Sequence, residues 1–281
     1  MTGIDKVSQI PFRSKVMGES AVISVVMPVK NVGAWIQNIK KNLEFCADSG
    51  FLVEFIFVYT EQDGDRSISL LKGLADEFSS DEVVIRFAEC RQPGIYIAMN
   101  RGVDLASSRM LLFLGADDTL APGLVDVLPY IIGSNNPCIL ADTVILGQSD
   151  SKISDFRKSG GRAGQIHWLL GMPRIHQSII YNALYIEALN LRFNPDLRVT
   201  SDYIFTCEVI ESMDSEPFVI DRVIASYNDS GFSSRYSSWQ LYLEHIKGFA
   251  QSRRLRKYLP LVVLTRFMLI GLKLARFVVR V

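Results

Sequence analysis

The 281-residue chain lacks several features that would assign it to a specialised class of protein. Its four cysteines, at positions 46, 90, 138 and 207, are far apart and form no C-x-x-C pair. This spacing fits neither a zinc site nor a disulfide framework, and it indicates a reducing cytoplasm. The amino terminus, MTGIDKVSQIPF, has no apolar core of the kind found in signal peptides. The sequence also has no internal repeat and no low-complexity segment.

Acidic residues are missing from one end of the chain, although the net charge is zero. The segment from His245 to Val281 has nine Lys or Arg and no Asp or Glu, which leaves a net charge of −9 on the rest. Its basic residues alternate with aliphatic ones, and no aromatic platform for stacking bases accompanies them, so we expect no nucleic-acid partner.

The same segment ends in a long apolar run, LPLVVLTRFMLIGLKLARFVVRV, that four cations interrupt. Arg266, Lys273 and Arg280 recur every seven residues, so a helix would carry them on one side. Such a helix is expected to lie in the membrane interface rather than to span the bilayer. Attraction to anionic lipid would come from Arg253, Arg254, Arg256 and Lys257. The alternative is a helix packed on the body or on a second subunit in a homodimer, with its basic stripe in solvent.

The first hundred residues alternate between predicted strands and helices. Apolar, β-branched runs predict strands over 22–29, 51–59 and 83–87, and helices are expected after Asn31, as its cap, and over 67–78. This alternation predicts a parallel sheet with right-handed crossovers. The second half predicts helices over 122–132, 183–190 (begun by Asn182) and from a Ser201 cap to Met213. Strands are expected over 137–146 and 218–227, with a hairpin or mobile loop over 147–164.

The segment QPGIYIAMNRGVDLASSRMLLFLGADDTL, residues 92–120, contains the candidate chemistry. It predicts a glycine turn, a helix, a buried strand over 110–114 and then the adjacent carboxylates Asp117 and Asp118. Open α/β sheets bind ligands at the carboxyl ends of their strands, and two carboxylates there suit Mg²⁺ or Mn²⁺ bridging nucleotide phosphates. Alternatively, the pair and Thr119 cap a helix that begins at Ala121-Pro122.

Several segments together resemble family 2 glycosyltransferases of the GT-A fold. The turn, helix and strand of these enzymes read G-I-Y-D-A-M-N-K-G and then L-N-S-D-D, and the matching residues here are Gly94, Ile95, Tyr96, Ala98, Met99, Asn100, Gly102, Phe113, Leu114, Asp117 and Asp118. Further matches are the first strand, SVVMPVKN, Pro173–Ser178 (P-x-x-H-Q-S), Ser201–Tyr203 (A-D-Y-D-L) and Gly231–Ser233 (G-G-I-S). The resemblance therefore extends from Val22 to Ser233.

The resemblance implies an α/β fold of the GT-A type, with a Rossmann-like, mostly parallel central sheet flanked by helices. The glycosyltransferase domain would cover residues 1–240, with a nucleotide-sugar half at about 20–120 and an acceptor half at about 121–240. Residues 241–281 would form the basic amphipathic tail.

By the same resemblance, the protein would be an inverting, metal-dependent hexosyltransferase of bacterial cell-surface polysaccharide or lipopolysaccharide synthesis. It would move a sugar from a nucleotide-diphosphate donor, most simply a UDP-sugar, to a lipid-linked or glycan acceptor at the cytoplasmic face of the membrane. The implied donor-binding residues are Pro28, Asn31, Glu61, Asp63, Asn100 and Asp117, and the metal ligands are Asp118 and Asp117.

Asp202 would be the catalytic base, and its alternative role is to complement the dipole of its helix. His176 and Trp168 are candidates for contact with the acceptor or the diphosphate, and their alternatives are a hydrogen-bonded structural histidine and a core tryptophan.

Relatives carry V-D-G-G-S-T-D-G-T after the second strand, whereas this chain reads FVYTEQDGDRS. Val58 or Tyr59 replaces the Asp that holds the base, with Glu61 or Asp65 as substitutes, and Ile97 and Gly115 also depart from the pattern. These departures leave a non-catalytic GT-A scaffold as the alternative function. A sugar nucleotidyltransferase is a weaker one, since Pro28–Asn31 is not a glycine-rich basic loop.

Overall fold

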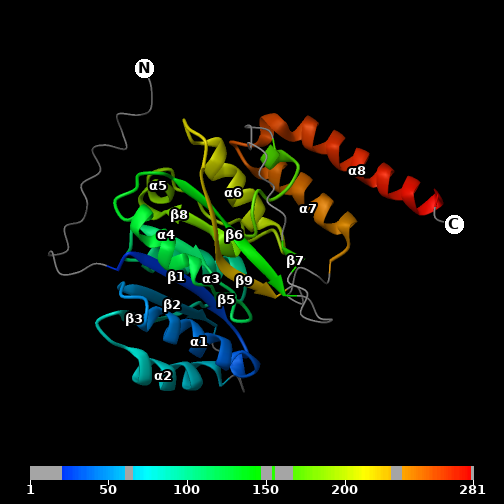
Figure 1. The fold of residues 1–281 in the computed structure, drawn as a ribbon. Helices are drawn as coiled ribbons and strands as arrows, with labels where there is room; N and C mark the ends of the chain where they lie inside the picture. Colours follow the sequence, from blue (N-terminus) through cyan, green and yellow to red (C-terminus); the bar gives the residue numbers. More distant parts are fainter. Residues whose placement is uncertain (1–20, 61–65, 147–153, 156–166, 229–235, 280–281) are drawn as a thin grey trace.

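A computed structural model describes residues 21–60, 66–146, 154–155, 167–228 and 236–279. Its centre is a nine-stranded mixed sheet in the order β3-β2-β1-β4-β8-β6-β9-β5, with β7 paired to β6 (Figure 1). The strands are β1 (Ile23–Val29), β2 (Val53–Tyr59), β3 (Val83–Glu89), β4 (Met110–Phe113), β5 (Thr119–Leu120), β6 (Cys138–Leu146), β7 (Ser154–Asp155), β8 (Ile179–Asn182) and β9 (Phe218–Asn228). The expected strands are therefore present.

The first four strands form the predicted parallel unit. β1 pairs in parallel with β2 and β4, and β2 pairs in parallel with β3. β1, β2 and β4 are almost wholly buried, as their apolar runs require of strands covered on both faces. β8 then pairs antiparallel with β4 and β6, so the sheet is mixed in its second half.

Helices cover both faces of the sheet. One face packs against α1 (Ile36–Ala47), α2 (Ser67–Phe78) and α4 (Gly123–Ile131). The other packs against α3 (Ile95–Leu105), α5 (Ala183–Ala188) and α6 (Ser201–Glu211). Short 3₁₀ turns lie at Val32–Ala34, His167–Leu169, His176–Ser178 and Arg256–Tyr258. The α/β class expected from the sequence is confirmed.

Three expected helix caps differ from the structure. The Asp117-Asp118 pair does not cap α4, because β5 intervenes and the helix begins only at Gly123, without a side-chain cap. Ser201 does not cap α6 either, since its hydroxyl accepts the Asn194 N–H instead. Asn31 precedes a 3₁₀ turn in the left-handed conformation and makes no side-chain cap. Asn182 does cap α5, because its Oδ1 accepts two backbone N–H groups of that helix.

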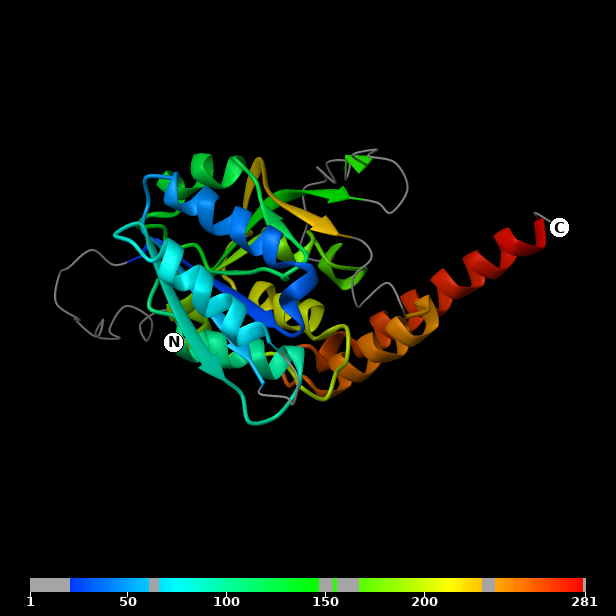
Figure 2. The same ribbon diagram turned by 90° about the horizontal axis from the view of Figure 1, so that it is seen from below.

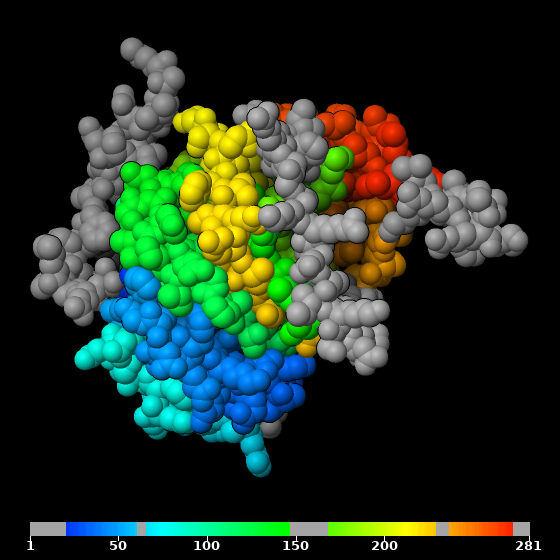
Figure 3. Space-filling model, viewed as in Figure 1, coloured from blue at the N-terminus to red at the C-terminus, as the bar shows by residue number. Residues whose placement is uncertain are grey.

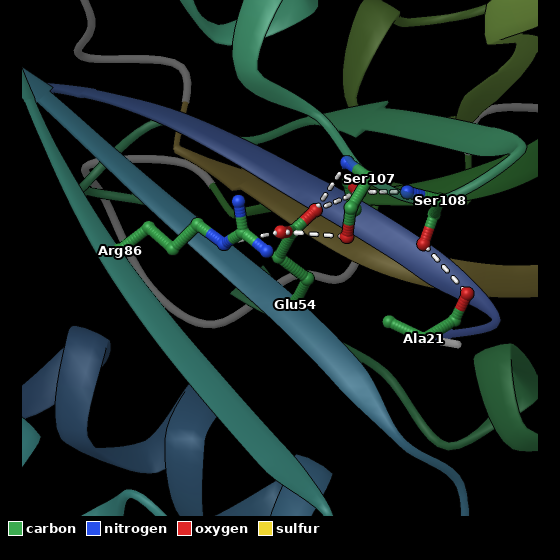
Figure 4. A network of polar contacts seen from close by, with 6 residues as sticks. Ala21, Glu54, Arg86, Ser107 and Ser108 are labelled. Carbon is green, nitrogen blue, oxygen red and sulfur yellow. Dashed lines mark hydrogen bonds and ion pairs between the residues drawn. The ribbon is translucent and has the colours of Figure 1, made fainter. Parts of the chain in front are cut away.

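A buried carboxylate joins the amino ends of the parallel strands (Figure 4). Glu54 on β2 is fully buried, and it accepts hydrogen bonds from the Ser24 hydroxyl and from the Ser107 N–H and hydroxyl. Arg86 on β3 completes the group with an ion pair at 2.8 Å. Both carboxylate oxygens of Glu54 thus accept hydrogen bonds, and these bonds offset the cost of burying the charge. The network links the amino ends of these strands, which lie opposite the carboxyl ends where the site described below opens.

The carboxyl-terminal helices pack on the outer side of α6. α7 (Ser238–Gln251) and α8 (Leu259–Val279) run side by side, and α8 extends past α7 away from the sheet (Figure 2). Phe249 of α7, Leu255 between the two helices and Val262 of α8 join a buried cluster with Trp168 and Ile204. They form one flank of the molecule, shown in orange and red in Figure 3. Among the described helices, none is both long and apolar enough to cross a bilayer.

A glycine permits the close approach of α7 to α6. A Cβ on Gly248 would lie 2.4 Å from a side-chain carbon of Ile204, well inside van der Waals contact. Any larger residue would push the two helices apart, and interior packing tolerates such overfilling poorly.

Arg266 contradicts the expected basic stripe. Its side chain is only 1% exposed and points into the body, where its guanidinium donates to His245 Nδ1, to the Leu169 and Leu170 carbonyls and to the Tyr203 hydroxyl. The seven-residue spacing is therefore no sign of a common solvent face. The outward side of α8 is instead apolar, with Leu264, Phe267 and Met268 each more than half exposed. The side chains of Lys273 and Arg280 lie outside the described part.

Candidate active site

A cavity of about 370 Å³ opens at the carboxyl ends of β1 and β4. Its charged lining comes from three regions that are distant in sequence: the segment after β4, residues 174–177 and residues 198–202, where α6 begins. Its apolar lining includes Ile95, Met99, Met172, Ile175 and Val199. A concave, mostly apolar site with a few convergent polar groups is the common form of a small-molecule site.

Asp118 is a buried carboxylate that holds three segments of the cavity wall together. It is 2% exposed, and its Oδ2 accepts the Gly115 N–H at 3.1 Å and the Gln177 amide at 2.8 Å. Its Oδ1 accepts the Asn228 N–H at 3.0 Å. This one carboxylate therefore ties the exit of β4 to the 3₁₀ turn and to the end of β9. Burial, with the neighbouring Asp117 charge, nevertheless raises its pKa to about 6.

Asp117 is the more open member of the pair. It lines the cavity, and burial raises its pKa. Both carboxylates converge on Gly115: a Cβ there would lie 2.6 Å from Asp118 Oδ2 and 2.7 Å from Asp117 Oδ1. The glycine that departs from the family pattern thus provides the space in which the two carboxylates sit together.

The donor set suits a magnesium-type ion. Among the described residues, no group of three or more His, Cys, Asp or Glu side chains is placed to hold a metal. Mg²⁺, however, commonly takes only one or two protein carboxylates and completes its shell with water and substrate phosphates. Asp117 beside Asp118 provides such a pair, and a cation would offset both the burial and the Asp117 charge that raise the pKa of Asp118.

Asp202 faces the same cavity from the first turn of α6. Its Oδ1 accepts the Tyr203 N–H at 2.8 Å and the Tyr96 hydroxyl at 3.4 Å. Burial raises its pKa to about 6, and these two hydrogen bonds oppose the shift. A carboxylate with such a pKa is ionised at neutral pH and can still accept a proton in a reaction.

His176 forms part of the cavity wall in its neutral form. The ring is 7% exposed and stacks on Phe113 with centroids 5.2 Å apart. Burial lowers its pKa to about 3. Its Nε2 is enclosed without a hydrogen-bond partner in the described part of the chain. The residue therefore contributes no charge at neutral pH.

Of the other predicted site residues, Pro28 lines the cavity, whereas Asn31, Asn100 and Trp168 are not part of its lining. The Asn100 amide exchanges two hydrogen bonds with the Phe193 backbone, which is a structural use of the side chain. Trp168 is 3% exposed and packs edge-on against Tyr258 of the tail. Glu61 and Asp63 lie outside the described residues, as do Asp65 and Gly231–Ser233.

The structure also brings residues to the cavity that the sequence did not single out. Gln177, which follows His176, binds Asp118, and Arg174 pairs with Asp142 on β6 at 3.3 Å. Arg198 lines the cavity just before α6. Gln177 is a fixed letter of the P-x-x-H-Q-S segment, so the motif could have indicated it. Arg174 occupies a variable position of the same segment, and nothing in the sequence marks Arg198.

The mixed α/β sheet, with Asp117 and Asp118 after β4 and Asp202 lining the same cavity, has the fold of the GT-A glycosyltransferases. The family described as Glycosyl transferase family 2 matches residues 24–174, and the chain belongs to this family. A PGL/p-HBAD biosynthesis glycosyltransferase of Mycobacterium tuberculosis is 31% identical over 88% of this chain and 91% of its own length. Glycosyltransferase activity is therefore assigned to the protein.

Two solved structures share the fold. The S. aureus TarS fragment 1–349 in complex with UDP superposes with a TM-score of 0.60 at 15% identity, over 84% of this chain and 70% of that one. The mannosyltransferase PcManGT of Pyrobaculum calidifontis, in complex with GDP-Man and Mn²⁺, gives a TM-score of 0.55 at 12% identity, over 96% and 80%. At these identities the likeness concerns the fold alone.

Proposed function

We propose that the protein is an inverting glycosyltransferase that moves a sugar from a UDP-linked donor to the hydroxyl of a lipid-linked or glycan acceptor. One observation carries the proposal: Asp202 opens into the same cavity as Asp117, so a base and a phosphate-binding pair face one space. The mycobacterial relatives act in PGL/p-HBAD biosynthesis, which supports a cell-surface product. The UDP complex of TarS supports the choice of nucleotide.

In this mechanism Asp202 is the general base. It takes the proton of the acceptor hydroxyl while that oxygen forms a bond to the anomeric carbon, and the bond from that carbon to the diphosphate breaks on the opposite side. The anomeric configuration is thereby inverted. The Tyr96 hydroxyl and Tyr203 N–H hold Asp202 Oδ1, which leaves Oδ2 for the proton.

The diphosphate would lie beside Asp117 and Asp118. Mg²⁺ or Mn²⁺, when bound there, would neutralise charge that develops on the leaving diphosphate. Asp117 would contact the ion from its more open position, while Asp118 keeps the pair in place through its three N–H partners. Pro28, at the end of β1, lines this cavity and would contact the nucleoside, whereas the same role for Asn31, Glu61 and Asp63 stays a prediction from the sequence. His176 would donate or accept a neutral hydrogen bond, and the apolar wall around Met99 and Ile175 favours an acceptor with an apolar part.

The test is a panel of sugar nucleotides with Mn²⁺, in which release of the nucleoside diphosphate is measured. We expect turnover with one donor, and a loss of at least a hundredfold in Asp202→Asn, since a positioned general base contributes about 10²–10⁴-fold. UDP binding by Asp202→Asn should stay unchanged, whereas Asp117→Asn should weaken it in the presence of Mn²⁺. A chain that binds no UDP, GDP or dTDP at millimolar concentration would instead be a non-catalytic scaffold.

We also propose that the tail rests on an anionic membrane surface at the cytoplasmic face. Leu264, Phe267 and Met268 form an outward apolar stripe on α8, and the exposed Arg253, Arg256 and Lys257 lie at its start. Changing the three apolar residues to serine should reduce sedimentation with phosphatidylserine-containing vesicles at least tenfold. The matched control replaces the exposed Phe218 and Val219 of β9 in the same way and should have no effect. A monomer–dimer shift, with no vesicle binding in the wild type, would assign the stripe to a second subunit.

A further inference from the structure

Glu244, in the middle of α7, binds the segment that leads into the catalytic helix. Its Oε1 accepts the Arg198 N–H at 2.9 Å, and its Oε2 accepts the Val199 and Thr200 N–H groups at 2.9 and 3.1 Å. The Thr200 hydroxyl adds a fourth bond at 3.2 Å. Three consecutive backbone amides therefore converge on a single carboxylate. Hydrogen bonds to an ionised acceptor are the strong ones in proteins.

The segment held in this way is part of the site. Arg198 and Val199 line the cavity, and Asp202 follows two residues after Thr200. The Thr200 carbonyl accepts the Ile204 N–H and so starts the first turn of α6. Because Ser201 does not cap this helix, the position of its first turn depends on the 198–200 backbone that Glu244 binds.

We infer that Glu244 is a positioning residue for the transfer reaction, through which the tail fixes the cavity wall and the catalytic carboxylate. The inference rests on the proposed role of Asp202. Glu244 touches neither donor nor acceptor in this scheme, and it acts only through the backbone of residues 198–200. A misplacement of about 1 Å at a reacting group can cost roughly a hundredfold in rate.

Electrostatics supply a second signature of the link. Burial is the main cause of the raised pKa of Asp202, and the charge of Glu244 adds to it. Other titratable groups that interact with Asp202 are Tyr96 on α3, Tyr181 on β8 and Cys207 on α6, and burial raises the pKa of each, so that all three stay neutral. Neutralising Glu244 should therefore lower the pKa of Asp202. The acidic limb of the kcat/KM profile, which reports the base of the free enzyme, should move to lower pH.

A matched control exists on the same interface. Glu211, at the opposite end of α6, also anchors the tail, through the Tyr258 hydroxyl at 2.8 Å and Lys257 Nζ at 2.5 Å. Glu244→Gln and Glu211→Gln each neutralise one carboxylate between α6 and the tail. Only the first touches the segment beside Asp202, so a general loosening of the tail should affect both variants alike.

The experiment compares the full-length wild type with these two variants in three measurements: backbone hydrogen exchange at 198–200, UDP affinity with Mn²⁺, and turnover of the active sugar nucleotide against pH. For Glu244→Gln we expect faster exchange, UDP affinity within about twofold of wild type, turnover lowered at least tenfold and an acidic limb at lower pH. Glu211→Gln should resemble the wild type in all of these. If Glu244→Gln does not fold, Glu244→Asp keeps the charge but withdraws it by one methylene, and it should lower turnover with little movement of the limb.

Equal turnover and equal pH profiles in the two variants would overturn the inference and make Glu244 an ordinary structural anchor. If the wild type turns over no sugar nucleotide, the proposed function fails separately. Backbone hydrogen exchange at residues 198–200 then tests the role of Glu244 without any activity measurement. An exchange rate in Glu244→Gln equal to that of the wild type would overturn the inference.

Discussion

Replacing Arg266 with methionine tests whether the tail is an integral part of the folded body. The guanidinium makes four hydrogen bonds to neutral partners and lies over the rings of Tyr203 and Tyr242. Methionine keeps much of the apolar stem but removes the donor from the buried Leu169 carbonyl, the part-buried Leu170 carbonyl, the Tyr203 hydroxyl and His245 Nδ1. Each such group costs about 1–3 kcal/mol, and relief from burying a charge offsets part of the sum. We therefore expect a loss of about 3 kcal/mol in the free energy of unfolding, or roughly 10 °C in Tm.

Denaturant unfolding of the wild type, Arg266→Met and Arg253→Met measures this loss. Arg253 is an exposed arginine in the same segment, and its replacement should change stability by less than about 0.5 kcal/mol. The hydrogen bond from Arg266 to His245 Nδ1 also requires neutral His245. Burial and the Arg266 charge lower the pKa of His245 from 6.5 to about 3. The unfolded chain binds the proton more tightly, so stability is lost as pH falls from 6.5 toward 3. If Arg266→Met changed the free energy of unfolding as little as the control does, the tail would not be an integral part of the folded body.

Two further predictions concern carboxylates with opposite roles. Glu54→Gln should lower stability by about 1–3 kcal/mol, because it weakens the bonds to Ser24, Ser107 and Arg86, and it should leave kcat unchanged; a variant equally stable in denaturant would contradict the network's role. Asp202→Asn should raise stability by about 3 kcal/mol at pH 8, since the folded pKa of about 6 exceeds the unfolded value of 3.8. That gain should shrink as pH falls from 6 to 4, and a pH-independent gain in thermal melts would show that Asp202 is not desolvated.

The sequence indicates the sheet, the Asp117-Asp118 pair and Asp202 because strand-length apolar runs and local motifs are properties of neighbouring residues. Long-range geometry is a different matter. The seven-residue repeat places Arg266 on one side of a helix but does not say which side faces the body. Glu244 lies more than forty positions from the amides that it binds, and no pattern in the chain links the two. Asp118 could not be distinguished from Asp117 by sequence, since only the fold brings the Asn228 N–H to it.

The central claim is that one cavity holds the donor's diphosphate at Asp117 and presents its sugar to Asp202. A crystal structure of the full chain with Mn²⁺ and the donor that gives turnover tests it most directly. We expect the ion within coordination distance of an Asp117 oxygen and Asp202 Oδ2 facing the anomeric carbon from the side opposite the diphosphate. A donor bound elsewhere, or a sugar whose anomeric carbon is turned away from Asp202, would contradict the account.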